Sequence, residues 1–428
     1  MILAIILVGL VLLLLTGLPI FAGLGLMAGA LLILVEGQIG SLAEIVFGKL
    51  NVYLLVAIPL FALMAHIMIR SRVVDDLYDA AHTLVRHLPG GLAVATVLSC
   101  TLFAAISGSS VATALTIGTT AMPQMRRFGY RPRDIYGVIA AGGTLGILIP
   151  PSGPMILYAV VSETSIGALF VAGLLPGLLV ALLFSAWCVA SARLRGGGTV
   201  SERADLREAL AVLGRAFWAL TLPPVVLGGM YFGVFTATEG AAIGAVQALL
   251  IASLVYRRLG WRDLFEAAYE TTRMTAMLFM ILAAAAMFSH VLTIMRIPAD
   301  LVEAVLAAGV SATTFLVAVM AAIVVLGMFL ETISIILITT PIVLPALAAF
   351  DIDPVWYGIL LMINLEMALI TPPIGMNLFV IKGIARAPMS EIIHGALPYV
   401  FLMLLGLVIL FLFPELALWL PSTMGYGR

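Results

Sequence analysis

Two double-proline motifs interrupt apolar stretches of the sequence. The first, IPPSGP, spans 149–154, and the second, TPPIGMN, spans 371–377. A proline has no backbone N–H group and its ring clashes with the preceding helical turn, so each motif should break a helix. Unpaired carbonyl groups are costly in lipid, and such a break persists only where protein, water or an ion satisfies them. The motifs therefore indicate a site for an ion or a small substrate at membrane depth.

Residues that can offer oxygen atoms, or expose main-chain carbonyls, surround both motifs. In the first half of the chain they are Ser107, Ser109, Ser110, Thr113, Gly142, Gly143, Thr144 and Ser152. In the second half they are Glu331, Thr332, Ser334, Asn364, Glu366, Thr371 and Asn377. Oxygen donors without a grouping of His or Cys suit a hard cation rather than zinc.

Glu331 and Glu366 are the individual candidates that carry charge. Ionisable groups at membrane depth are costly and therefore functional candidates, and we favour Glu331 over Glu366. Simpler explanations exist for each residue type. A double proline can be a packing kink, a membrane Ser or Thr can bond its own helix backbone, and Glu331 could serve only the backbone donors around it. The occurrence of both motifs at matched positions favours a binding site.

The elements that position these residues should be membrane-spanning helices. The chain has 428 residues, of which 63% are hydrophobic and 10% charged, with a mean hydropathy of +1.21. Roughly 20 apolar residues cross the hydrocarbon core, and runs of that length recur along the chain. Cys100 and Cys188 lie in apolar segments and suggest neither a disulfide nor a metal cluster. The chain lacks a Walker A loop, HExxH and G-x-S-x-G, so we expect neither ATP hydrolysis nor an enzyme, and no nucleic-acid partner.

Basic residues predict the orientation of the chain. Most of the 21 Lys and Arg residues fall in five loops, near 70–86, 126–133, 193–215, 257–273 and 382–386. The positive-inside rule places these loops in the cytoplasm, with the N-terminus cytoplasmic and the C-terminus periplasmic. The first apolar segment has no basic leader or obvious cleavage site, so we expect a retained helix.

Two segments must turn back within the membrane to keep this orientation. Residues 91–125 start and end at cytoplasmic loops, and their centre, ISGSSVATA, supplies small residues for a turn. Residues 312–349 are bounded by outward-facing gaps, with a tip near GMFLETIS. We predict two re-entrant helical hairpins that enter from opposite faces.

The sequence contains an internal repeat. Pro150-Pro151 matches Pro372-Pro373 at a spacing of 222 residues, and TTAMP at 119 matches TTPIV at 339. We predict repeat 1 over 20–190, with a broken helix at 135–160, and repeat 2 over 240–410, with a broken helix at 356–381. A cytoplasmic loop and one connecting helix within 191–239 invert the second copy. The expected fold is a single all-α polytopic membrane domain of two inverted-topology repeats.

Three blocks carry a resemblance to a known family: GGTLGILIPPSGPMILYAVVSETSIGALFVAGLLPGLL, GMFLETISIILITTPIVLP and ITPPIGMNLFVIKGIA. The chain resembles, over essentially its whole length, the large membrane subunit of tripartite ATP-independent periplasmic (TRAP) transporters. The resemblance implies sodium-driven uptake of an organic acid across the bacterial inner membrane by an elevator mechanism. It also implies a periplasmic substrate-binding protein and a small four-helix membrane subunit, which we expect to be a separate chain.

The resemblance and the motifs together assign site residues. Sodium site 1 is expected at Ser107, Gly143, Thr144, Gly146 and Pro150, and sodium site 2 at Gly327, Thr332, Thr371, Pro372 and Met376. Substrate contacts are expected from Ser109, Ser110, Ser152, Glu331 and Asn377. Glu331 departs from the family pattern, which often has aspartate there, but it keeps the charge.

Other functions remain open from the sequence. The chain could be a free-standing sodium- or proton-coupled anion symporter that needs no binding protein. It could be an intramembrane enzyme with Glu331 and Glu366 as an acid pair, although it lacks a recognised nucleophile or metal spacing. A passive channel is disfavoured because two gates at opposite faces suit alternating access. The identity of the organic acid is not encoded in any motif.

Overall fold

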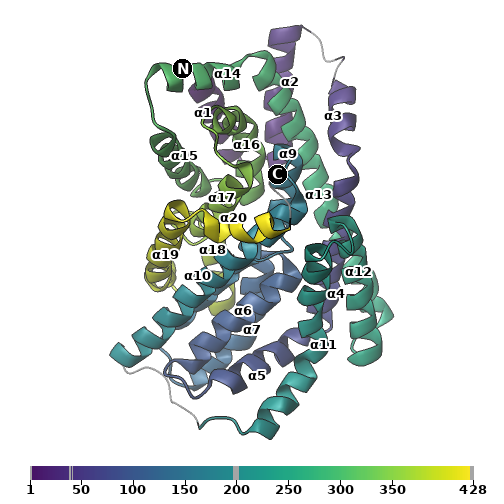
Figure 1. Ribbon diagram of the computed structural model, residues 1–428, viewed down its shortest axis with the longest axis vertical. Helices are drawn as coiled ribbons and strands as arrows, with labels where there is room; N and C mark the ends of the chain where they lie inside the picture. Colours follow the sequence, from purple (N-terminus) through teal and green to yellow (C-terminus); the bar gives the residue numbers. More distant parts are fainter. Residues whose placement is uncertain (1, 38–39, 41, 196–201, 425–428) are drawn as a thin grey trace.

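A computed structural model describes residues 2–37, 40, 42–195 and 202–424 of the chain. Every regular element in these ranges is a helix (Figure 1). Eight helical segments are long and apolar enough to cross a membrane: Tyr53–Arg70, Pro132–Ser162, Ile166–Leu194, Leu206–Tyr231, Ala237–Val255, Trp261–Ile294, Thr332–Ala349 and Met389–Leu412. The prediction of an all-α protein with many membrane-length helices is confirmed.

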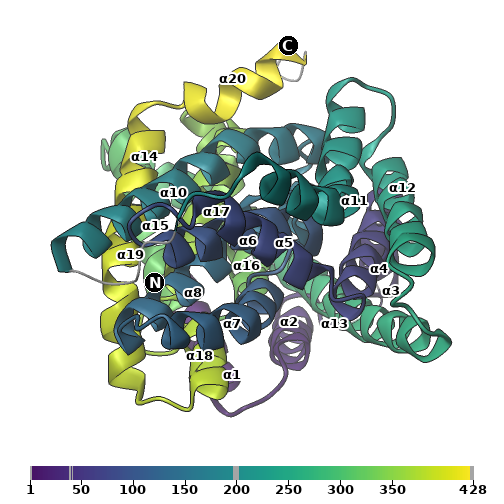
Figure 2. The same ribbon diagram turned by 90° about the horizontal axis from the view of Figure 1, so that it is seen from below.

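One group of helices, which we call the lateral group, forms one side of the molecule. It comprises α2 (Ile20–Glu36), α3 (Leu42–Leu50), α4 (Ala57–Arg70), α12 (Ala237–Leu250) and α13 (Trp261–Ile294). Helix α13 packs against α2, α3 and α4, and α12 packs against α4. In both views α3, α4 and α12 lie on the opposite side of the molecule from α18 and α19 (Figures 1 and 2).

A second set, the central group, is built around α8 (Pro132–Leu148). Helix α8 packs against α6 (Gly91–Ser107), α7 (Ser110–Arg127), α10 (Ile166–Arg195) and α19 (Met389–Leu412). The approach to α19 is close because a Cβ atom at Gly137 would collide with the Gly395 carbonyl, and one at Gly395 would collide with the Arg133 carbonyl. Every residue of α8 from Ile135 to Leu148 is buried. This helix is therefore the centre of the core.

Two pairs of consecutive helices, each joined by a short tip, occupy the segments in which we predicted hairpins. The first pair is α6 and α7, with Gly108 and Ser109 at its tip. Helix α7 ends at Arg127, two residues beyond the predicted bound of 125. The second pair is α15 (Ala312–Gly327) and α16 (Thr332–Ala349), with residues 328–331 at its tip. Helix α16 packs against α9, α13 and α14.

Each double proline lies between two helices. Helix α8 ends at Leu148 and α9 (Gly153–Ser162) begins after Ser152. Helix α17 (Pro354–Leu369) ends shortly before the second motif, and α18 (Met376–Ala385) begins after Gly375. We call residues 149–152 the first break and residues 370–375 the second break.

The remaining elements connect these parts. Helix α5 (Val73–Val85) is amphipathic and packs its apolar face against α6, while α11 (Leu206–Tyr231) packs against α5 and α12. The other helices are α1 (Ile2–Leu15), η1 (Tyr53–Val56), η2 (Ile251–Val255), α14 (Ile297–Ala307) and α20 (Glu415–Thr423).

Candidate functional site

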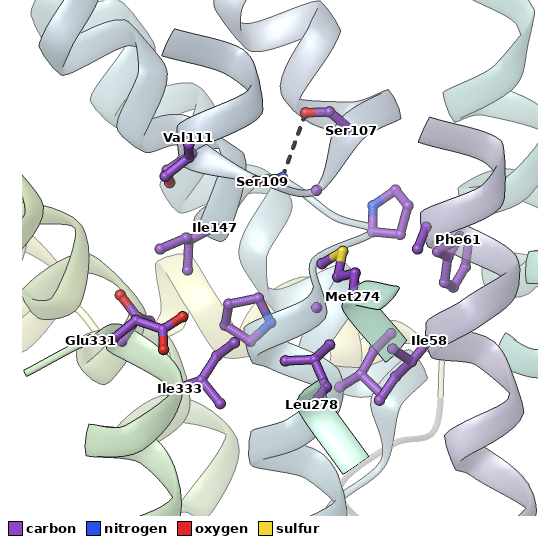
Figure 3. Close-up of a pocket in the computed structure, with 18 of the residues that line it drawn as sticks. Ile58, Phe61, Ser107, Ser109, Val111, Ile147, Met274, Leu278, Glu331 and Ile333 are labelled. Carbon is purple, nitrogen blue, oxygen red and sulfur yellow. Dashed lines mark hydrogen bonds between the residues drawn. The ribbon is translucent and has the colours of Figure 1, made fainter. Parts of the chain in front are cut away.

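A cavity of about 150 Å³ lies where the central group faces the lateral group. The first tip contributes Ser107 to Val111, and the second tip contributes Glu331 to Ile333. The first break reaches it through Pro151, and residues that flank the breaks also line it: Gly153 and Pro154 after the first, and Leu369 and Met376 on either side of the second. Figure 3 shows Ser107 and Ser109 on one side of this space and Glu331 and Ile333 on the other. Both tips, the first break and the helix ends that flank the second break thus meet at one place.

Four helices start at this cavity. The first residues of α7, α9, α16 and α18 are Ser110, Gly153, Thr332 and Met376, and all four line it. The N-terminal turn of a helix carries unpaired N–H groups and a partial positive charge, which favours an anion. Among the described lining residues Glu331 is the one charged side chain, and none is basic. Helix ends therefore provide the positive potential that Lys or Arg would provide elsewhere.

The first tip is shaped by close backbone approach. Gly108 ends α6 at φ +58°, and a Cβ atom there would collide with the carbonyl oxygen of Pro151 in the first break. Ser109 caps α7 by accepting from Ala112 N at 3.4 Å. The Ser107 and Thr113 hydroxyl groups share a hydrogen bond at 2.9 Å, so Thr113 stabilises the tip itself. Glycine at position 108 allows the tip to touch the break.

The first break is enclosed by protein. Residues 149–152 are all buried, and the Ser152 hydroxyl has no hydrogen-bond partner among the described residues. Ser110 Oγ donates to the Thr144 carbonyl at 3.0 Å, and the Thr144 hydroxyl donates to Ala141 O at 2.7 Å. A Cβ atom on Gly146 would lie 2.6 Å from the Ser109 carbonyl, and one on Gly143 would lie 2.9 Å from Ala114 Cα. The glycines therefore bring the end of α8, which leads into this break, against the start of α7.

The second tip carries the cavity's carboxylate. Glu331 occupies the N-cap position of α16, but its side chain accepts no capping hydrogen bond. This geometry does not support the explanation that Glu331 serves only the backbone donors of its own tip. Thr332 is buried, as is Ser334, whose hydroxyl has no partner within the described chain. Gly327 approaches α17, where a Cβ atom would collide with Ala368.

The second break is more open. Thr371 and Pro372 are half-buried, and Pro373 and Ile374 are exposed. Thr371 Oγ1 donates to Met367 O at 2.7 Å, and Gly375 has φ +37°. Asn377, one residue into α18, is buried and donates from Nδ2 to Ala140 O of α8 at 3.3 Å, while its Oδ1 has no partner in the described ranges.

The predicted site residues therefore divide into two sets. Those that line the cavity are Ser107, Ser109, Ser110, Glu331, Thr332 and Met376. Those that do not line it, and lie in the breaks, in the helices that flank them or at the end of α15, are Gly143, Thr144, Gly146, Pro150, Ser152, Gly327, Thr371, Pro372 and Asn377. In the described part of the chain, no group of three or more His, Cys, Asp or Glu residues is placed so that it could hold a metal ion. Any cation in the breaks would depend on carbonyl and hydroxyl oxygens.

Two features of the site escaped the sequence analysis. One is the apolar wall from the lateral group, formed by Ile58, Phe61, Ala62, Met274, Met277 and Leu278 of α4 and α13 (Figure 3). These residues belong to ordinary apolar helices and carry no motif. The other is the contact of Glu366 with the first half of the chain, at Leu148 N. Its signal was present, because Glu366 is an acid in a membrane segment, but its partner lies 218 residues away.

The fold defines a polytopic membrane protein with an internal cavity, and comparisons with known proteins identify the family. Residues 7–416 match the family model "Tripartite ATP-independent periplasmic transporter, DctM component". The chain belongs to this family of transporter permease subunits and is not an enzyme. The predicted resemblance is confirmed.

Two relatives and one solved structure illustrate the match. The chain is 41% identical to the C4-dicarboxylate TRAP transporter large permease protein DctM of Pseudomonas aeruginosa, covering 93% of this chain and 94% of the relative. It is 36% identical to the ectoine TRAP transporter large permease protein TeaC of Halomonas elongata, covering 90% of each. The crystal structure of the Alcanivorax borkumensis YdaH transporter shares the fold, with a TM-score of 0.63 and 16% identity over 91% of this chain and 88% of that one.

Proposed function

We propose that this chain is the large permease subunit of a sodium-coupled uptake system for an organic acid. The observation that carries the proposal is the convergence of four helix N-termini on a cavity whose described lining residues include no basic side chain. Such a site favours a carboxylate through backbone N–H groups. The names of the two relatives above include a C4-dicarboxylate and ectoine, and both ligands carry carboxylate groups.

Sodium ions would bind in the breaks behind the cavity. Main-chain oxygens beside Pro150 and Pro372, with hydroxyls such as Ser107 and Thr371, are hard donors of the kind that sodium accepts. A cation there offsets the cost of moving an anion into the low-dielectric interior of the membrane. Each net positive charge that enters also gains about 2.3 kcal/mol per 100 mV of membrane potential. The sodium gradient and the membrane potential then drive uptake.

The proposed movement is of the elevator type. The cavity lies between the central and lateral groups, with α4 and α13 on one side and both tips on the other. In this proposal the lateral group stays fixed while the tips and breaks carry the substrate across. The two helix pairs act as re-entrant hairpins that gate opposite faces of inverted repeats.

The proposed setting follows from the family. The chain would lie in the bacterial inner membrane with its N-terminus in the cytoplasm and its C-terminus in the periplasm. A periplasmic binding protein would deliver the organic acid, and a small four-helix membrane subunit would brace the permease. The lipid bilayer covers the remaining apolar surface.

Reconstitution tests this function. Proteoliposomes that contain the permease and its small subunit, with the binding protein outside, should accumulate radiolabelled carboxylate only under an inward sodium gradient. Uptake that persists without sodium and collapses without a proton gradient would overturn sodium coupling. Uptake by this chain alone would overturn the role of the partners and favour a free-standing symporter.

A further inference from the structure

Glu366 is a fully buried carboxyl group that does not line the cavity. It lies on α17 in the second half of the chain, and its Oε1 accepts a hydrogen bond from Leu148 N at 2.9 Å. Its Oε2 has no partner among the described residues. A buried carboxyl group without a cation is costly, so the position requires a compensating role.

The contact falls on the last turn of α8, directly before the first break. In a regular α-helix the N–H of residue 148 pairs with the carbonyl of residue 144. Helix α8 extends through Leu148, whose amide also donates to Glu366 Oε1, and the Thr144 carbonyl also accepts from Ser110 Oγ at 3.0 Å. These two groups, partners of one another in the last turn of α8, each have an additional side-chain partner from a different element. The turn that leads into the first break is thus held by α7 on one side and by α17 on the other.

A second polar residue of α17 makes a similar contact. Asn364 is fully buried and donates from Nδ2 to the Met320 carbonyl of α15 at 2.7 Å. Helix α17 therefore bonds the backbone of two other elements, α15 through Asn364 and α8 through Glu366. The first of these elements belongs to the second helix pair, and the second leads into the first break.

We propose that Glu366 is a positioning residue for the first break, and that cation binding in the first half depends on it although it touches neither cation nor substrate. The inference rests on the proposed sodium coupling. In this role Glu366 acts by accepting a hydrogen bond from the Leu148 amide. A neutral side chain of the same length that also accepts a hydrogen bond should therefore fulfil the role of the carboxyl group.

Two variants separate acceptance from charge. Glu366→Gln keeps an acceptor oxygen at the same reach, whereas Glu366→Met keeps the length and removes the acceptor. Glu303→Gln and Glu303→Met provide matched controls, because Glu303 is 73% exposed on α14. Sodium-dependent thermal stabilisation of the purified permease with its small subunit gives the half-saturating sodium concentration. We expect Glu366→Met to raise this sodium concentration about tenfold, which is the effect of one lost buried hydrogen bond. Glu366→Gln should change it less than threefold.

Amide hydrogen exchange gives a readout that does not need sodium. Exchange over residues 145–149 should accelerate about tenfold in Glu366→Met and stay near wild type in Glu366→Gln. If wild-type protein shows no sodium effect, the proposed coupling fails while this measurement still judges the positioning role. Unchanged exchange in Glu366→Met would overturn the inference, as would a Gln variant as impaired as Met, because that result would assign the role to the charge. Should Glu366→Met not fold, Glu366→Asp withdraws the carboxyl group by one methylene and should give the same acceleration.

Discussion

The two breaks have the same motif but different surroundings. The first, residues 149–152, is buried throughout and contacts the tip of its own helix pair at Gly108. The second, residues 370–375, exposes Pro373 and Ile374. Side chains form hydrogen bonds with the backbone of the helix before each break, but these side chains belong to different parts of the chain. Ser110 and Glu366 reach the backbone before the first break from other helices, whereas Thr371, within the second break, donates to Met367 O of the preceding helix α17.

This difference separates a preformed break from an incomplete one. Protein contacts fix the first break, so its carbonyl groups already have a defined geometry. The second is partly exposed, and we infer that a bound cation or a movement of the second helix pair would complete it. Equivalent sequence motifs therefore do not imply equivalent sites, because the elements packed against them differ.

The largest expected effect comes from separating the first tip from the first break. Gly108→Ala places a methyl group against the Pro151 carbonyl, at a φ that side chains disfavour. We expect uptake to fall roughly a hundredfold, since overpacking and backbone strain together cost about 3 kcal/mol. Proteoliposome uptake measures this loss.

Gly129→Ala is the matched control for that substitution. Gly129 has φ +75° with nothing within 4 Å of an added Cβ, so it carries the strain without the collision. Uptake by Gly129→Ala should stay within about fivefold of wild type, because strain alone costs about 1 kcal/mol. Equal losses in both variants would contradict the idea that contact between tip and break matters.

An intermediate effect is expected from sodium itself. If the second break is completed by a cation, sodium should slow amide exchange over 370–378 about tenfold and change exchange over 145–149 less than twofold. Hydrogen exchange followed by mass spectrometry, with choline replacing sodium, measures both segments in one sample. Equal protection of the two segments would remove the distinction between a preformed and an incomplete break.

The smallest effect is expected at the hydroxyl of the second break. Thr371→Val removes the donor to Met367 O while keeping the shape of the side chain, and Thr371→Ser retains the donor. The half-saturating sodium concentration for uptake should rise about fivefold in Val and little in Ser, as expected for one hydrogen bond. A Val variant with wild-type sodium dependence would exclude Thr371 from the cation site.

Local sequence patterns predicted much of this molecule. Proline chemistry placed the helix interruptions, because a missing N–H acts at its own position. Small residues placed the first tip for the same local reason. Apolar run lengths established the all-helical membrane class.

The remaining features depend on packing between distant segments. The apolar wall from α4 and α13 has no motif, and any apolar helix could have supplied it. The partner of Glu366 is a backbone amide, which has no signature in a sequence. The unequal burial of the breaks arises from which helices cover them, and a repeat alignment treats both copies as the same.

Lys49 offers a practical consequence of the arrangement. It lies at the end of α3 in the lateral group, and its ammonium donates to the Val160 carbonyl of α9 at 3.3 Å. Helix α9 directly follows the first break, so an elevator stroke of α9 past α3 would release this amine. The sequence contains one other lysine, Lys382. An amine-selective acylating reagent would therefore modify Lys49 faster when more molecules have left this conformation. The rate at Lys49 relative to that at Lys382 would report the fraction of such molecules.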